Sequence, residues 1–197
     1  MLPITLGLMI AVQFVDLTIV IPVKNPPDLE GFIQANLELL KENNIIVIDS
    51  GGGEPLKSYC KKYIKQDLQM WEARKLGYTE VETTFTLNLD CDVIVSLAYI
   101  KNALQLLRDN KAEAVSIHFA PVKTGHLEFG ASIWNTEVLR KLYDYPPKPV
   151  EKLIKVGKQE WVTAFQHGFC ECSYMWRKLL SSGGRLETLS YRAIHLK

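Results

Sequence analysis

The sequence predicts a single α/β domain (residues 1–197) with a mostly parallel central sheet and helices on both faces. Short runs of apolar, often β-branched residues alternate with segments whose apolar residues recur every three or four positions. Runs that are apolar throughout are typical of parallel strands buried on both sides. The periodic segments are typical of amphipathic helices. Polar residues follow several of the apolar runs, and α/β proteins bind their ligands at such strand ends.

The alternation is clearest in the first half of the chain. The run LTIVIPV ends at an Asn-Pro-Pro breaker, after which Asp28 is a typical first cap of a helix. The run IIVI stops at Asp-Ser-Gly-Gly-Gly, and Ser96 caps a long amphipathic pattern. The pattern therefore predicts strands at 17–23, 45–48, 68–71 and 85–89, and helices at 28–43, 54–66, 72–77 and 96–108.

The second half continues the alternation with weaker signals. A helix that begins near Gly168 is expected to end at the Ser-Ser-Gly-Gly stretch, and a short strand follows it. We expect that last strand at 189–195. Before the helix near Gly168 we expect strands at 112–120 and 127–134 and a helix at 135–142.

Composition limits the class of protein. Hydrophobic residues make up 47% of the chain, charged residues 23%, and the net charge is +1, so no basic excess points to a nucleic-acid partner. The spacing of Cys60, Cys91, Cys170 and Cys172 is not that of a small disulfide-bonded scaffold. These features favour a reducing, cytoplasmic compartment.

The first fifteen residues carry no acidic or basic side chain. This apolar stretch is too short to span a membrane and has no cationic segment before it, as a secretory signal would. An extra strand or helix packed on the core is favoured over association with a membrane surface.

Two aspartates one residue apart interrupt the apolar run at 85–95. On an extended strand Asp90 and Asp92 project to the same side, while Cys91 points away. Two carboxylates at a strand end suit Mn²⁺ or Mg²⁺, which take further ligands from water and substrate phosphates. The alternative is structural, with one aspartate capping the loop and the other preceding the next helix.

Four motifs in order, IVIPVKN, IIVIDSGGG, ARKLG and LNLDCD, resemble the nucleotide-sugar half of family-2 inverting GT-A glycosyltransferases. The resemblance implies a nucleotide-sugar-binding half at 17–95 and an acceptor and catalytic half at 96–197. It implies transfer of a sugar from a nucleotide-diphosphate donor to a hydroxyl of a glycan, protein or lipid, with inversion. The chain also resembles small glycosyltransferase-like proteins of hyperthermophilic archaeal viruses, and a viral origin would imply the host cytoplasm as its location.

The resemblance also implies roles in donor binding. Asp49 would hydrogen-bond the base or ribose, Arg74 would lie near the base or the diphosphate, and Asp90 would reach the ribose or a metal-bound water. Lys24 stands where the family often has an aromatic residue. Structural alternatives are a loop cap for Asp49 and a surface ion pair for Arg74. The implied nucleotide-sugar contacts are Pro22, Val23, Lys24, Asn25, Asp49, Ser50, Arg74 and Asp90.

Metal and catalytic residues are implied in the same way. Asp92 would bind the metal, helped by Asp90 and by His195, which could equally be solvated. Glu171 occupies the position of the catalytic base, although a glutamate in a first helical turn is also favoured by the helix dipole alone. Other carboxylates left open as the base are Glu128, Asp144, Glu151 and Glu160.

Two other functions stay open at this point. A nucleotidyltransferase on a related fold would use the same metal and phosphate chemistry, but the segment 23–27 lacks the glycines of a phosphate loop. A protein that keeps the fold and has lost catalysis would tolerate substitution of Asp92 and Glu171.

Overall fold

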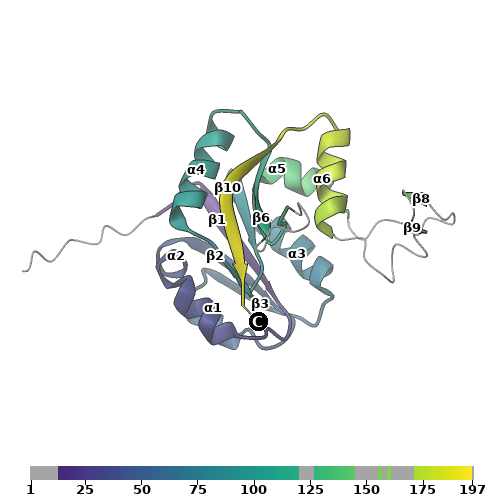
Figure 1. Cartoon of the computed structure of the whole chain (residues 1–197). Helices are drawn as coiled ribbons and strands as arrows, with labels where there is room; N and C mark the ends of the chain where they lie inside the picture. The colour runs from purple at the N-terminus through teal and green to yellow at the C-terminus, as the bar shows by residue number, and fades with distance from the viewer. Residues whose placement is uncertain (1–12, 120–126, 145–154, 157–158, 161–170, 197) are drawn as a thin grey trace, which may run out of the picture.

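A computed structural model of the chain describes residues 13–119, 127–144, 155–156, 159–160 and 171–196 (Figure 1). Its helices are α1 (Leu29–Ala35), α2 (Leu37–Glu42), η1 (a 3₁₀ turn, Glu54–Ser58), α3 (Met70–Thr79), α4 (Leu97–Arg108), α5 (Thr136–Leu142) and α6 (Glu171–Ser181). Its strands are β1 (Leu17–Val23), β2 (Asn44–Asp49), β3 (Lys62–Lys65), β4 (Phe85–Leu89), β5 (Val93–Ile94), β6 (Ala114–Phe119), β7 (Ala131–Asn135), β8 (Lys155–Val156), β9 (Gln159–Glu160) and β10 (Leu186–His195).

Eight strands form one sheet in the order β3-β2-β1-β4-β7-β6-β10-β5. β3, β2, β1 and β4 are parallel to one another, and β6 is parallel to β10. β7 runs antiparallel between β4 and β6, so these two neighbours point the same way. The predicted α/β fold with a mostly parallel sheet is therefore confirmed.

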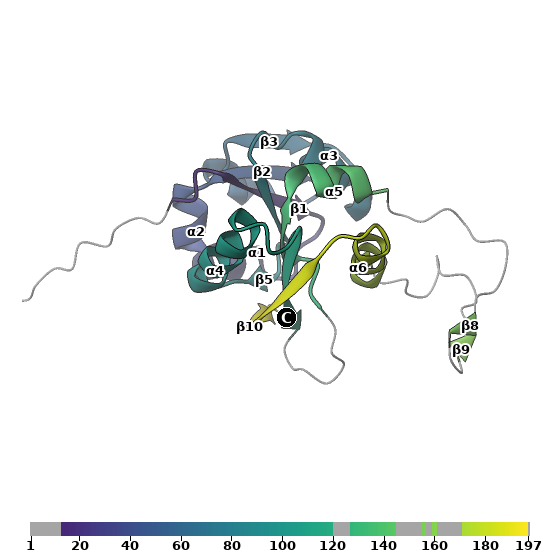
Figure 2. The same cartoon turned by 90° about the horizontal axis from the view of Figure 1, so that it is seen from above.

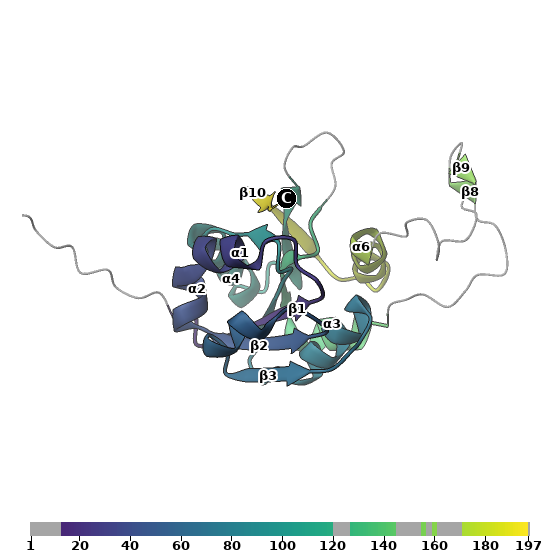
Figure 3. The same ribbon diagram turned by 90° about the horizontal axis from the view of Figure 1, so that it is seen from below.

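Helices cover both faces of this sheet (Figure 2). On one face α1, α2 and α4 pack through Phe32, Leu40 and Tyr99, and on the other α3, α5 and α6 pack through Tyr78 and Trp176. All seven residues of β1 are buried because this central strand has neighbours on both edges and helices on both faces. Figure 3 shows the same two groups of helices from the opposite side.

Two helical predictions are corrected by the structure. The expected helix at 28–43 is two helices, because the backbone of Asn36 leaves the helical conformation (φ −106°, ψ 14°). The side-chain amide of Asn36 donates there to the carbonyls of Phe32 (3.1 Å) and Val93 (3.2 Å). The expected helix at 54–66 is only the turn η1 followed by β3. Tyr63 and Ile64 favour a strand, and the free edge of β2 supplies its backbone partner.

Two strand predictions also change. The expected strand at 68–71 is the start of α3, whose first turn is fixed by a capping box in which Glu72 accepts from the backbone N–H of Gln69 at 2.9 Å. The expected strand at 127–134 is β7, which begins only at Ala131, since Leu127 makes an isolated bridge to His118.

The apolar residues 1–12 lie outside the described residues, as does the expected helix start near Gly168. Within the described part of the chain, no helix combines the length and the apolar character needed to cross a lipid bilayer.

Candidate active site

The carboxyl ends of β1, β2, β4, β6 and β10 share one edge of the sheet, because these strands point the same way. Asp90 and Asp92 follow β4, and His195 ends β10. The first residues of α3 and α6 reach the same edge, which brings Arg74 and Glu171 to it. Side chains from distant parts of the sequence therefore meet where α/β folds bind ligands.

The centre of this edge is a buried group that we call the Arg74 cluster, made of Arg74, Asp90, Glu171 and Tyr143. The Arg74 guanidinium donates through Nη2 to Asp90 Oδ1 (2.6 Å) and through Nη1 to Glu171 Oε2. The Tyr143 hydroxyl donates to the other oxygen, Glu171 Oε1. Only 9% of the Arg74 side chain, 13% of the Glu171 side chain and 21% of the Asp90 side chain are exposed. One cation therefore compensates two carboxylates that have little contact with solvent.

Burial alone would lower the pKa of Arg74, but Asp90 and Glu171 oppose it and hold the pKa well above its ordinary value. The guanidinium carbon lies 5.7 Å from the centre of the Phe129 ring, a contact that suits a cation. Arg74 Nε has no hydrogen-bond partner among the described residues. The cation is therefore permanent and keeps one buried donor unused.

Asp90 is fixed by its backbone as well. Its N–H donates to the carbonyl of Gly130 at 2.9 Å. A Cβ at Gly130 would stand 2.2 Å from Asp90 Oδ2, so only glycine leaves room for this carboxylate. Between the two aspartates, Cys91 is buried, and burial raises the pKa of its thiol to about 12.

A second group lies beside the Arg74 cluster and consists of Asp92, His195 and Glu128. Nδ1 of His195 lies 3.6 Å from Asp92 Oδ2, and Nε2 of His195 lies 3.0 Å from Glu128 Oε2. Hydrogen-bonding and charge interactions with the carboxylates of Asp92 and Glu128 raise the pKa of His195 to about 9. Glu128 is buried, and its Oε1 accepts from the N–H of Gly130 at 2.9 Å.

This second group fits a divalent ion in its chemistry but does not form a complete set of ligands. Asp92 offers carboxylate oxygens and is 33% exposed, and His195 offers an imidazole nitrogen. Asp90 is engaged by Arg74, and no cluster of three or more metal-binding side chains is found within the described ranges. Further ligands would have to come from a diphosphate and water, as is usual for Mg²⁺ sites.

The Asp49 carboxylate caps the loop that follows β2. The carboxylate is fully buried, and Oδ1 accepts from the N–H groups of Gly51 (2.8 Å) and Gly53 (2.9 Å), while Oδ2 accepts from the Tyr63 hydroxyl. This is the loop-capping alternative that the sequence left open. Its contact with a base or ribose stays a prediction.

The loops after β1 and β2 are joined to each other. The N–H of Ser50 donates to Val23 (2.8 Å), and the N–H of Asn25, which has a φ of 50°, donates to Gly51 (2.9 Å). Pro22 and Val23 are paired with β2 and buried, so their side chains belong to the core. Ser50 Oγ is buried without a hydrogen-bond partner among the described residues.

Lys24 does not take the place of a stacking aromatic ring. Its ammonium group donates to the carbonyl of Leu68 at 2.8 Å and lies 3.6 Å from Asp67. It therefore ties the end of β1 to the segment that enters α3. The predicted contact of Lys24 with the nucleotide remains a prediction.

The structure brings together five of the predicted residues, namely Arg74, Asp90, Asp92, Glu171 and His195. Among the other carboxylates left open as the base, Asp144 is paired with Lys178 and Tyr174, while Glu128 lies beside His195. Glu151 falls outside the described residues, and the side chain of Glu160 does too. Sequence reasoning gave Glu128 no role as a partner of His195 and missed Tyr143, because neither belongs to a recognisable motif.

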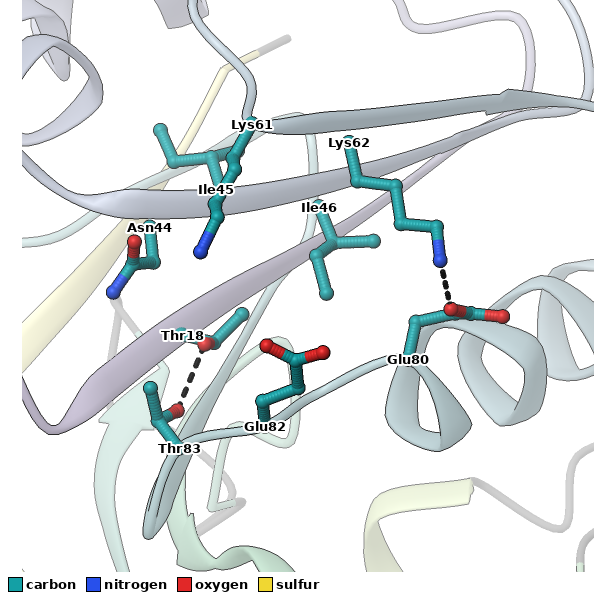
Figure 4. Close-up of a pocket in the computed structure, with 9 residues that line it drawn as sticks. All are labelled: Thr18, Asn44, Ile45, Ile46, Lys61, Lys62, Glu80, Glu82 and Thr83. Carbon is teal, nitrogen blue, oxygen red and sulfur yellow. Dashed lines mark hydrogen bonds and ion pairs between the residues drawn. The ribbon is translucent and has the colours of Figure 1, made fainter.

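A cavity of about 180 Å³ lies at the opposite, amino edge of the strands (Figure 4). Thr18, Asn44 and Thr83 line it with two lysine and two glutamate side chains, and Lys62 pairs with Glu80 across it. The charges of its lining compensate one another, and the cavity holds none of the predicted site residues.

Solved structures with the same fold were found, although no family model and no curated protein matches the chain. S. aureus TarS 1–349 in complex with UDP-GlcNAc is 14% identical, with a TM-score of 0.59 over 89% of this chain and 56% of that one. The bifunctional IspDF from Campylobacter jejuni is 13% identical, with a TM-score of 0.54 over 89% of this chain and 50% of that one. A CMP:2-keto-3-deoxy-manno-octonic acid synthetase complexed with CTP is 11% identical, with a TM-score of 0.57 over 90% of both chains.

The likeness shows the fold. The chain has the Rossmann-like α/β architecture that GT-A and nucleotidyltransferase domains share, and two of these neighbours hold nucleotide ligands. The chain spans little more than half of the TarS structure and half of IspDF. None of these structures supports the viral origin considered from the sequence.

Proposed function

We propose that the protein is an inverting glycosyltransferase that moves a sugar from a nucleotide-diphosphate donor to an acceptor hydroxyl. The observation that carries the proposal is the Arg74 cluster, which holds Asp90 of the D-x-D motif and Glu171 on one guanidinium. These two residues are 81 positions apart, since 171 − 90 = 81. A transferase needs donor and acceptor groups within reach of each other, and this arrangement supplies that proximity.

In this proposal Glu171 is the general base. The acceptor oxygen attacks the anomeric carbon of the sugar, its proton passes to the Glu171 carboxylate, and the bond from carbon to the diphosphate oxygen breaks. The nucleoside diphosphate leaves from the opposite face, so one displacement inverts the anomeric configuration. Arg74 offers a permanent positive charge close to this reaction.

Asp92 and His195, with help from Asp90, would hold a divalent ion, Mn²⁺ or Mg²⁺, at the donor. Such an ion neutralises charge that develops on the leaving diphosphate. The loops at 22–25 and 49–50 would contact the base and ribose. The acceptor is a glycan, a protein or a lipid, and we place the reaction in the cytoplasm because the spacing of the four cysteines is not that of a disulfide-bonded scaffold.

A nucleotidyltransferase is the second candidate, and one observation favours it. The CMP-sugar synthetase complexed with CTP matches over 90% of both chains, so the two chains have similar lengths. Such an enzyme would take a nucleoside triphosphate and release pyrophosphate. A protein without catalysis, the third candidate, would bind a nucleotide or a partner and transfer nothing.

Binding of nucleotides with and without Mn²⁺ separates these candidates. We expect one nucleoside diphosphate (UDP, GDP, CDP or TDP) to raise the melting temperature of the wild type, and Asp92→Ala to abolish the metal-dependent part. Stabilisation by CTP with release of pyrophosphate would favour the nucleotidyltransferase. No stabilisation by any nucleotide would contradict both enzymatic functions.

The role of Glu171 as general base is tested by measuring sugar transfer from the nucleotide sugar that the titration identifies. We expect Glu171→Gln to lower kcat about 10²- to 10⁴-fold with donor binding retained. Glu42→Gln is the matched control, because Glu42 is an exposed glutamate on α2. Wild-type transfer by Glu171→Gln would move the role of base to another carboxylate.

A further inference from the structure

Tyr143 is a buried residue next to the proposed base that no motif singled out. It caps the carboxyl end of α5 with an N–H bond to the carbonyl of Leu139 (2.8 Å) and is 4% exposed. Its hydroxyl donates to Glu171 Oε1 and also lies 3.3 Å from the carbonyl of Trp71. A phenol has one proton to donate, and a carboxylate accepts it more strongly than a peptide carbonyl.

The ring of Tyr143 is fixed by two other aromatic residues. Tyr78 meets it edge-on with ring centres 4.9 Å apart, and Phe129 lies nearly parallel to it at 6.2 Å. Phe129 also lies under Arg74. The hydroxyl is therefore held in place by packing that does not depend on Glu171.

Two donors from different elements reach Glu171, one at each carboxylate oxygen. Arg74 on α3 binds Oε2, and Tyr143 after α5 binds Oε1, so rotation of the carboxylate would break one bond or both. Each carboxylate oxygen has a second lone pair that can accept another proton. The two bonds thus orient the Glu171 carboxylate.

We infer that Tyr143 is a positioning residue that aims the Glu171 carboxylate at the acceptor hydroxyl. The inference rests on the proposed function, in which Glu171 is the base. Tyr143 acts only through Glu171 and touches neither donor nor acceptor. Burial raises the pKa of the Tyr143 hydroxyl far above neutrality, so the hydroxyl keeps its proton as it holds the carboxylate.

The test is Tyr143→Phe, which keeps the ring contacts and removes only the hydroxyl. We expect kcat to fall about 10- to 100-fold, as misplacement of a reacting group by about 1 Å does. The KM for the donor and the melting-temperature shift with the nucleoside diphosphate should stay within about twofold of wild type, because neither involves Glu171. Tyr191→Phe is the matched control, since its hydroxyl accepts from the side-chain amide of Asn102 on α4 (2.7 Å), among the residues that cover the other face of the sheet.

A double variant identifies the partner through which Tyr143 acts. Adding Tyr143→Phe to Glu171→Gln should lower kcat no further, because residues that act as a unit are not additive. An additional loss, an unchanged kcat in the single variant, or a parallel loss of donor binding would overturn the inference. An inactive wild type, or wild-type transfer by Glu171→Gln, would instead overturn the proposed function.

Discussion

Asp49, which is buried, and Asp90, which is partly buried, lie at the same edge of the sheet and are satisfied in opposite ways. Asp49 accepts hydrogen bonds from neutral donors, two backbone N–H groups within four residues and the hydroxyl of Tyr63 on the adjacent strand. Asp90 is satisfied by the charge of Arg74, which it shares with Glu171 from the far end of the chain. The first arrangement is a turn motif, whereas the second is a network of charges.

This difference in hydrogen-bond donors indicates which of the two carboxylates a substrate can reach and bind. Neutral donors of the loop surround Asp49, so a ligand that used this carboxylate would have to displace the loop. The Arg74 cluster is held by charge instead, and charges of a substrate such as a diphosphate can compete for it. A charged, partly satisfied group is more typical of a functional site than a fully bonded turn.

Removing the cation should have the largest effect. We expect Arg74→Met to lower the free energy of unfolding by about 3–5 kcal/mol, because it leaves two largely shielded carboxylates without a compensating cation. Urea denaturation measures this change. The triple variant Arg74→Met, Asp90→Asn, Glu171→Gln should recover much of the loss, since no uncompensated charge remains. A loss that the triple variant does not recover would mean that packing, not charge, holds the cluster.

Asp49 should show a smaller effect that no second substitution recovers. We expect Asp49→Asn to lower the free energy of unfolding by about 1–3 kcal/mol, because a neutral amide oxygen accepts the two backbone N–H bonds less strongly than a carboxylate does. No substitution removes the two backbone N–H groups that donate to Asp49, so no second variant can recover the loss. Urea denaturation of Asp49→Asn measures the effect of the carboxylate, and that of Tyr63→Phe measures the effect of the hydroxyl that donates to it. A loss as large as that of Arg74→Met would contradict the comparison.

An exposed ion pair gives the smallest effect and a pH dependence of known sign. Arg108 binds Asp16 with two bonds (2.8 and 2.6 Å), and the hydrogen bond from Arg108 lowers the pKa of Asp16. A lowered pKa in the folded state stabilises the protein above the unfolded pKa, near 4, and this stability disappears as pH falls through the folded value. Both side chains are partly exposed, so the contribution stays below about 1 kcal/mol.

Melting temperatures of wild type and Asp16→Asn test this pair. The wild type should be slightly more stable at pH 7, and the difference should vanish near pH 3. A difference that persists or grows in acid would contradict the assigned sign. High salt should also reduce the difference at pH 7, because exposed charges are screened.

The parts of the fold that follow local rules were predictable from the sequence. β1 and β2 are apolar runs that end at turn residues, and Ser96 caps α4 with a bond from the N–H of Tyr99 (3.1 Å). β3 was not predictable in this way. Two of its four residues are exposed and none is buried, and they form a strand because β2 offers them a backbone partner. Such pairing depends on tertiary context, which propensity does not contain.

The same limit applies to the candidate site. The motif at 90–92 and the resemblance together pointed to Asp90, Asp92, Arg74 and Glu171, and the structure places these at one edge. Glu128 and Tyr143 have no motif, and their positions follow only from the order of strands and helices. His118 is a similar case, since it lies near the end of β6 with Nδ1 buried and without a partner among the described residues.

The separation of the residues in the Arg74 cluster has a consequence for the order of folding. Arg74 and Asp90 are 16 residues apart and meet when α3 packs on β1 and β2, whereas Glu171 lies 97 residues from Arg74. Long-range contacts of this kind form late, because closing a long loop is slow and entropically unfavourable. Docking of α6, which brings Glu171 to Arg74, is therefore expected to follow formation of the contact between Arg74 and Asp90.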